Sequence, residues 1–178
     1  AVAVASPTTE KRVSLPASLK QKKKKPLLWV DFLRPGLPPA ARVYSEAPNM
    51  KNLISLLDDY QVEFNVNNHR QLNLVFFSDA VMHLVRICRV LRQLRGSVML
   101  IGVGGSGRSS LARLASYMSG CEMETPEMVN NYSHMNFQED LKRVIKRAGV
   151  EGKQVCFMLS DTQVTDERYL EDINCILA

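Results

Sequence analysis

The sequence predicts an α/β fold in which helices flank a parallel sheet, and three observations support this expectation. Two short and almost wholly apolar runs, Val98 to Ile101 and Val155 to Leu159, are typical of strands buried on both faces. Around them, apolar residues recur every three or four positions, as in amphipathic helices. The first run leads directly into the glycine-rich stretch GVGGSGRSS, residues 102–110, after which the period becomes helical. The predicted order is therefore strand, glycine loop, helix.

Length and composition restrict the class of protein. The chain has 178 residues, of which 46% are hydrophobic, so it is long enough for about one domain with a real core. It has neither an apolar run that could cross a bilayer nor a secretory signal, so we expect an intracellular protein without a membrane partner. No metal-ligand spacing joins the cysteines, and we expect reduced, mostly buried thiols at Cys88, Cys121, Cys156 and Cys175.

The positive charge is concentrated at the N-terminus. Residues 1–25 carry seven basic residues and one acidic residue, whereas the other 153 residues carry 16 basic and 17 acidic ones. We expect residues 1–25 to form a disordered basic tail, which is solvated or serves as a localisation signal or anion-binding arm. A nucleic-acid ATPase would need this tail, because the rest of the chain is nearly neutral, so we expect no nucleic-acid partner.

Residues 26–72 are expected to form a proline-rich connector and a leading helix. Proline disfavours helices and inner strands between Pro26 and Pro48, so this part should be extended. We expect it to pack Trp29, Phe32 and Tyr44 against a neighbour. Asn49 is a plausible cap for the helix that follows. The helical stripe consists of Leu53, Ile54, Leu57 and Tyr60.

Residues 73–178 are expected to form the P-loop domain, in which the run LNLVFF, residues 72–77, leads into a helix that Ser78 or Asp79 can cap. The inner face of this helix is predicted to contain Val81, Leu84, Val85, Cys88 and Leu91. Its other face presents Arg86, Arg89, Arg92 and Arg95. These arginines form either a solvated face or a contact with an acidic neighbouring module.

The stretch 102–110 has the spacing of a phosphate-binding loop, G-x-x-x-x-G-K-[ST], with Arg108 in place of the lysine. Its glycines allow backbone N–H groups to point at phosphate oxygens, and the following helix adds its positive N-terminal end. The predicted nucleotide-binding residues are Gly102, Val103, Gly104, Gly105, Ser106, Gly107, Arg108, Ser109 and Ser110. The helix should bury Leu111, Leu114, Ala115 and Met118 and end at Gly120.

A carboxylate at the end of the second strand completes the expected magnesium site. The strand Val155 to Leu159 finishes near Asp161, which would hold Mg²⁺ together with the hydroxyl of Ser109. Active ATPases have a water-polarising glutamate at the next position, where this chain has Thr162, so we predict no catalytic residue.

Two further helices are expected around this strand. FQEDLKRVIKRAG should form one that ends at Gly149, and DERYLEDINCILA should form the last one. The inward residues of the first are predicted to be Leu141, Val144, Ile145 and Ala148. Those of the second are Tyr169 or Leu170, Ile173 and Ile176.

Four segments together resemble a known family far more specifically than the loop alone. They are DFLRPG, VFFSDAVMHLVRICRVLRQLRGSVMLIGVGGSGRSSLARLASYM, NYSHMNFQEDLKRVIKRAGVEGKQVCFMLSDTQV and YLEDINCIL. Over residues 29–178 the chain resembles the fourth AAA+ module of a dynein heavy chain, particularly an axonemal one. The resemblance implies a P-loop NTPase (AAA+) parallel sheet flanked by helices, which we expect to be incomplete at the C-terminal end.

The resemblance also implies a function and partners. Dynein heavy chains are minus-end-directed microtubule motors with a ring of six AAA+ modules, and the fourth is regarded as a regulatory or structural nucleotide site. The implied cofactors are ATP or ADP and Mg²⁺. The implied partners are neighbouring AAA+ modules, the microtubule, and the intermediate and light chains bound by the parent motor. The implied location is the cytoplasm, the cytoskeleton and the axoneme of a cilium or flagellum.

Departures from the family pattern keep alternatives open. The stretch 123–131, METPEMVNN, differs from the regular second strand of the family, and the basic tail has no counterpart in it. Arg108 keeps the charge of lysine but has a wider, planar head. We therefore expect nucleotide binding with weak or no hydrolysis; the alternatives are a docking fragment without nucleotide and an independent P-loop ATPase. An unpaired sheet edge predicts marginal stability or aggregation.

Overall fold

The computed structural model describes residues 27–47 and 49–177, so the tail expected at residues 1–25 lies outside the described residues. The elements of the N-terminal part are β1 (Trp29–Val30), the 3-10 helix η2 (Pro39–Ala41), β2 (Ser45–Glu46), α1 (Met50–Asn67), α2 (Ser78–Leu91) and α3 (Arg108–Met118). The elements of the C-terminal part are β3 (Glu122–Glu124), α4 (His134–Gly149), β4 (Val155–Phe157), the 3-10 helix η3 (Asp161–Gln163) and α5 (Arg168–Leu177). None of the described helices has the length and apolar composition needed to span a membrane.

Helices α1, α2 and α3 form the larger core, and their apolar stripes meet as the sequence predicts. The buried residues include Leu53, Leu57, Tyr60, Val81, Leu84, Val85, Cys88, Leu114, Ala115 and Met118. Asn49 caps α1, because its side chain accepts a hydrogen bond from the Lys51 N–H at 3.2 Å. The predicted cap of α2 is wrong. Ser78 is already helical, and Phe77, in extended conformation, occupies the cap position without a side-chain hydrogen bond.

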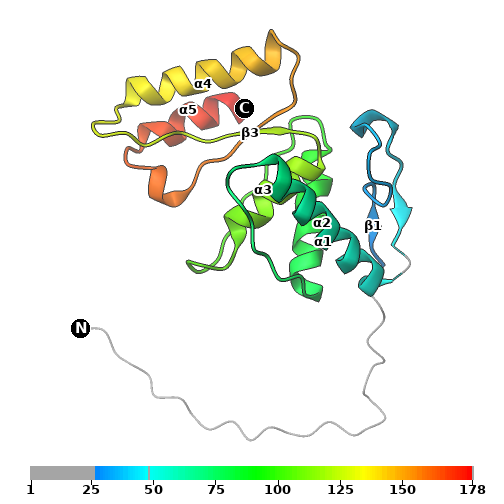
Figure 1. Cartoon of the computed structure of the whole chain (residues 1–178). Helices are drawn as coiled ribbons and strands as arrows, with labels where there is room; N and C mark the ends of the chain where they lie inside the picture. Colours follow the sequence, from blue (N-terminus) through cyan, green and yellow to red (C-terminus); the bar gives the residue numbers. More distant parts are fainter. Residues whose placement is uncertain (1–26, 48, 178) are drawn as a thin grey trace, which may run out of the picture.

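The proline-rich connector folds back as a small antiparallel hairpin of β1 and β2. Phe32 is buried, and its carbonyl accepts a hydrogen bond from the Tyr60 hydroxyl at 3.1 Å. The expectation that Trp29 and Tyr44 also pack inward is wrong, since both side chains remain exposed. The hairpin lies beside the helices at the edge of the larger core (Figure 1).

Two of the four arginines predicted on the outer face of α2 contact this connector. Arg92 lies with its Nε 2.9 Å from the buried Asp31 Oδ2 and donates to the carbonyls of Pro39 and Arg42, while Arg89 donates to the Trp29 carbonyl. Arg86, Arg89 and Arg95 are exposed, as the interpretation of a solvated face predicts. Arg92 instead binds the chain's own N-terminal hairpin, which neither sequence interpretation anticipated.

The C-terminal part forms a second, smaller core. Strands β3 and β4 pair in parallel, with Met123 opposite Cys156. Phe137 and Leu141 of α4 pack against Tyr169 of α5, and these two helices lie side by side (Figure 1). Strand β3 thus includes the first two residues of the stretch 123–131, which differs from the family pattern. Strand β4 ends two residues earlier than predicted. Ion pairs from Arg143 and Arg147 to Glu122 and Glu124 join α4 to β3.

Several apolar residues predicted to be buried are exposed. Val98 to Ile101 is not a strand, and Met99 and Ile101 are 83% and 87% exposed. A parallel strand is buried only when neighbours pair with it, and no strand among residues 27–47 and 49–177 does so. Ile145, Ala148 and Ile176 are exposed for a similar reason, since only one side of α4 and of α5 is covered.

Candidate phosphate-binding loop

The glycine-rich stretch forms an open loop that leads into α3. Gly105 and Gly107 have φ angles of +75° and +78°, a conformation that side chains with a Cβ rarely adopt. A Cβ added at Gly104 or Gly105 would meet nothing within 4 Å, so the crest of the loop is free on its outer side. The loop is closed by a weak hydrogen bond from the Ser106 N–H to the Val103 carbonyl at 3.4 Å. The backbone therefore has the turn that the glycine spacing predicts.

The loop ends at an uncapped helix N-terminus. Gly107 is the cap residue of α3, and among the described residues no side chain accepts a hydrogen bond from the first turn. The N–H groups of Arg108, Ser109 and Ser110 have no intrahelical acceptor, because the first helical bond of this turn runs from the Leu111 N–H to the Gly107 carbonyl at 2.9 Å. Free N–H groups and the positive end of the helix dipole make this position suitable for an anion.

Arg108 lies across the base of the loop. Its Nη1 donates to the Leu100 carbonyl at 3.4 Å, and its Cδ is 3.5 Å from the position that a Cβ on Gly102 would occupy. Among the described residues the guanidinium group bonds to this carbonyl and to no carboxylate, so its charge is available to a phosphate group. The residues around it fit a polyphosphate: a free helix end, flexible glycine backbone and one cation.

The segment 72–77 forms one wall beside the loop. Leu74 Cδ2 lies 3.8 Å from the position of a Cβ on Gly107. Two amide side chains of α1 hold this segment in place, since the Leu72 N–H donates to Asn65 Oδ1 at 2.7 Å and the Leu74 N–H donates to Gln61 Oε1 at 3.0 Å. The sequence alone does not single out Asn65 and Gln61, because no local pattern distinguishes them from other polar residues of the helix.

The structure does not join the predicted magnesium ligands. Asp161 is exposed in η3, and its Oδ1 accepts a hydrogen bond from the Thr162 N–H at 3.0 Å. No hydrogen bond links Asp161 to Ser109, and in residues 27–47 and 49–177 no three histidine, cysteine or carboxylate side chains form a group that could hold a metal. The magnesium role of Ser109 and Asp161 remains a prediction. The loop lies beside the larger core, whereas Asp161 follows a strand of the smaller core. The segment Val98 to Ile101, which leads into the loop, pairs with no described strand.

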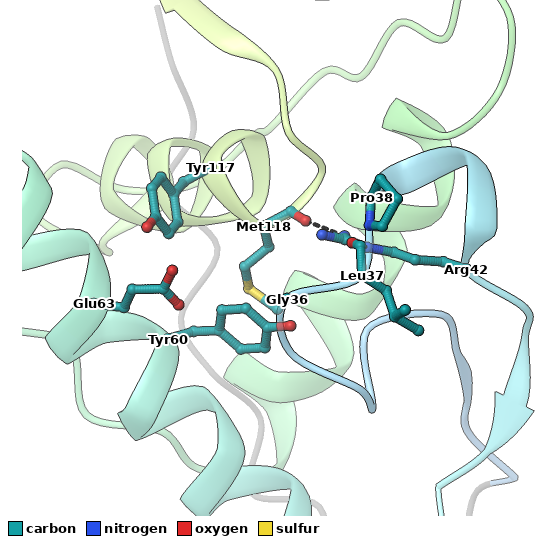
Figure 2. Close-up of a pocket in the computed structure, with 8 residues that line it drawn as sticks. All are labelled: Gly36, Leu37, Pro38, Arg42, Tyr60, Glu63, Tyr117 and Met118. Carbon is teal, nitrogen blue, oxygen red and sulfur yellow. Dashed lines mark hydrogen bonds between the residues drawn. The ribbon is translucent and has the colours of Figure 1, made fainter.

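The proline-rich connector binds the C-terminal end of α3. Arg42 donates through Nη1 to the Met118 carbonyl and through Nε to the Leu37 carbonyl at 2.8 Å (Figure 2). Gly120 follows the helix with a φ of +73°, as predicted, and a Cβ there would lie 2.8 Å from Pro39 Cγ. A cavity of about 290 Å³ separates this contact from Tyr60, Glu63 and Tyr117. The helix that carries the loop is thus fastened at its C-terminal end to the hairpin.

Comparison with known proteins connects these features to one family. Residues 72–178 match the family model described as the P-loop containing dynein motor region D4. The chain is 42% identical over 153 residues to human dynein axonemal heavy chain 6, a match that covers 86% of this chain and 4% of the relative. It is 41% identical over 152 residues to rat dynein axonemal heavy chain 1, covering 85% of this chain and 3% of the relative. It is 40% identical over 138 residues to the dynein-1-alpha heavy chain of the flagellar inner arm I1 complex of Chlamydomonas reinhardtii. That match covers 78% of this chain and 3% of the relative. The chain thus spans a small fraction of the length of these relatives. It belongs to the family of P-loop dynein motor D4 regions.

Proposed function

We propose that the chain is part of the fourth AAA+ module of an axonemal dynein heavy chain and that it binds ATP or ADP, with Mg²⁺, in a regulatory or structural role. The observation that supports this most directly is the loop 102–110 itself, because left-handed glycines lead into an uncapped helix N-terminus beside the cation Arg108. The expected phosphate contacts are the backbone N–H groups of residues 104–110, with Ser109 and Asp161 at the metal.

The proposed setting follows from the relatives. Their printed names describe axonemal and flagellar heavy chains, so we place this chain in the cytoskeleton of a cilium or flagellum. Its proposed partners are the neighbouring AAA+ modules of the same heavy chain. Through the parent motor, the proposed partners also include the microtubule and the intermediate and light chains.

Hydrolysis by this module is expected to be weak or absent. Phosphoryl transfer depends on positioning the nucleotide and on a group that orients the attacking water. Thr162 stands where active ATPases carry the orienting glutamate, and its side chain hydroxyl lies 2.9 Å from the hydroxyl of Ser160. Arg108 adds charge but cannot enter between phosphates as a compact ammonium group does.

The test is equilibrium binding of a fluorescent ATP analogue, with and without Mg²⁺, to the chain and to Arg108→Ala. We expect saturable binding that weakens strongly in the variant, because a charged hydrogen-bonding partner of the phosphates is lost. Arg86→Ala is the matched control, since Arg86 is an exposed arginine of α2 far from the loop in sequence. Magnesium-dependent ATP turnover that Asp161→Ala abolishes would contradict the proposal of weak hydrolysis.

A docking fragment without nucleotide is the second candidate, and the exposed apolar segment at Met99 and Ile101 favours it. The same titration separates the two functions. Absence of analogue binding to a chain that shows a cooperative unfolding transition would reject the nucleotide site and leave docking.

A further inference from the structure

A second cavity borders α3 and is lined by none of the loop residues 102–110. Its volume is about 310 Å³, and it is bordered by the end of α1, the middle of α3 and the start of β3. Phe64, Tyr117 and Met123 supply apolar walls, and Asn67 and Arg113 supply donors. Arg113 comes five residues after Arg108, which is more than a full turn further along the helix. The cavity is therefore separate from the phosphate-binding loop.

Arg113 has no acceptor in the part of the chain that the structure describes. Its Nε is buried without a hydrogen bond, and its guanidinium makes no ion pair with any residue of 27–47 or 49–177. Burial, and after it repulsion from Arg70, lowers the pKa of Arg113. Two neighbouring cations and a buried unpaired donor are unfavourable unless an anion accompanies them.

No carboxylate of the cavity wall neutralises Arg113. Glu122 borders the cavity, but its carboxylate pairs with Arg147 of α4 and lies 3.6 Å from Lys153 Nζ. The Asn67 amide donates to the Tyr117 hydroxyl at 2.9 Å, so it is oriented along the same wall. The cavity thus offers positive charge and donors beside an apolar surface, which is the combination that a small organic or inorganic oxyanion requires.

We propose that this cavity is an oxyanion-binding site in which Arg113 forms the main contact and the nearby charge of Arg70 adds to the attraction. The guanidinium fork matches both planar carboxylates and phosphate groups. Free phosphate and the carboxylate of a protein side chain share this chemistry, and the experiment separates them. The site is independent of the proposed nucleotide site.

The experiment uses the 178-residue chain carrying Arg108→Ala, so that phosphate binding at the loop is weakened. Sodium phosphate and, in a parallel arm, sodium acetate are titrated at an ionic strength held constant with sodium chloride. The readouts are the NMR signal of the Arg113 Nε–H group and the melting temperature, with the amides of Gly105 and Gly107 as reporters of the loop. We expect a saturable shift of the Arg113 signal and a rise in melting temperature, with little change at the two glycines.

Variants make the outcome decisive. Arg113→Gln should remove the rise in melting temperature, and Arg70→Gln should weaken anion affinity while raising the melting temperature without anion, because repulsion is relieved. Arg86→Gln, the same change on an exposed part of α2, should leave affinity unaltered. Binding of phosphate alone assigns the site to a free phosphate group, and binding in the acetate arm assigns it to carboxylates.

Two results would overturn the proposal. One is a response to both anions that does not exceed the response to sodium chloride. The other is a shift of the Arg113 signal in Glu122→Gln without added anion, together with no phosphate or acetate binding. That result would mean that Glu122 already neutralises Arg113 in solution.

Discussion

At the scale of single residues, the strongest effects on stability come from buried charges and buried ionisable groups. Asp31 is buried, and Arg92 Nε lies 2.9 Å from its Oδ2, but the N–H does not point at that oxygen, which has no aligned hydrogen bond. The contact is therefore an ion pair held by charge. Because Arg92 also donates to the carbonyls of Pro39 and Arg42, it links the N-terminal hairpin to α2.

Removal of Arg92 should destabilise the fold strongly. Arg92→Ala leaves the Asp31 carboxylate buried without a counter-charge, and we expect a loss of about 3 kcal/mol in the free energy of unfolding. Arg86→Ala, which removes an exposed arginine of the same helix, should change it by less than about 0.5 kcal/mol. Urea denaturation measures both. Equal effects of the two variants would mean that the ion pair does not hold the hairpin.

Cys88 should make stability fall at alkaline pH. Burial, and after it the charge of Asp31, raises the pKa of Cys88 to about 12. The unfolded thiol loses its proton near its ordinary pKa of about 8.5, so stability is complete below that pH and is lost as pH rises toward 12. The difference in unfolding free energy between Cys88→Ala and the unchanged chain, measured at pH 8 and pH 10.5, should shift in favour of the variant. A difference that is independent of pH would disprove the assignment.

The expectation that the cysteines are mostly buried is wrong for the chain as a whole. Cys88 is buried, Cys121 and Cys156 are half-buried, and Cys175 is exposed. The strands β3 and β4 are covered on one side only, which leaves the thiols beside them partly accessible.

At the scale of elements, α4 and α5 depend on a small aromatic core. The rings of Phe137 and Tyr169 stack with centroids 4.3 Å apart, and both side chains are almost fully buried. His134 Nε2 lies 2.7 Å from Asp172 Oδ2 and joins the same two helices at the surface. With so few buried residues, each one carries a large share of the contact between the helices.

Phe137→Ala should detach α5 from α4. Truncating a buried phenylalanine costs about 3–5 kcal/mol, and this core has little else to replace it. Ile145→Ala, on the exposed side of α4, should cost less than about 0.5 kcal/mol, because Ile145 is 53% exposed. Amide hydrogen exchange of α5 measures the effect. Unchanged protection of α5 in Phe137→Ala would show that other contacts hold the helix.

At the scale of the whole molecule, an apolar segment beside the larger core is covered by no described strand. In residues 98–103, Leu100 packs against the larger core, whereas Val98, Met99, Ile101 and Val103 are exposed. Such a segment with free backbone groups is a template for pairing with another chain.

Charged residues on this segment should prevent self-association. We expect Met99→Lys combined with Ile101→Lys to reduce concentration-dependent association in sedimentation velocity and to change the melting temperature little, since both side chains are exposed. Exposed Leu170 and Ile176 of α5 provide the comparison when they receive the same change. If only the α5 variants reduced association, the surface through which copies of the chain associate would lie on α5.

The sequence by itself determined the features that depend on local order. Helical periodicity located the five α-helices that the structure describes, the sequence predicted Asn49 and Gly120 as cap residues, and the glycine spacing predicted the turn of residues 102–110. The four segments that resemble dynein predicted the family. These features follow from neighbouring residues along the chain, because a cap, a turn and a helical stripe need no distant partner.

Only the tertiary structure decided which surfaces are covered. The apolar run Val98 to Ile101 has the composition of a buried strand but remains exposed, and Ile145 has the position of a core residue but faces solvent. Arg92 of α2 binds the connector, and Arg113 lies in a cavity without an acceptor among the described residues. The reason is physical: strand pairing, burial and ion pairs require a partner that is distant along the chain, and local periodicity cannot specify whether that partner is present.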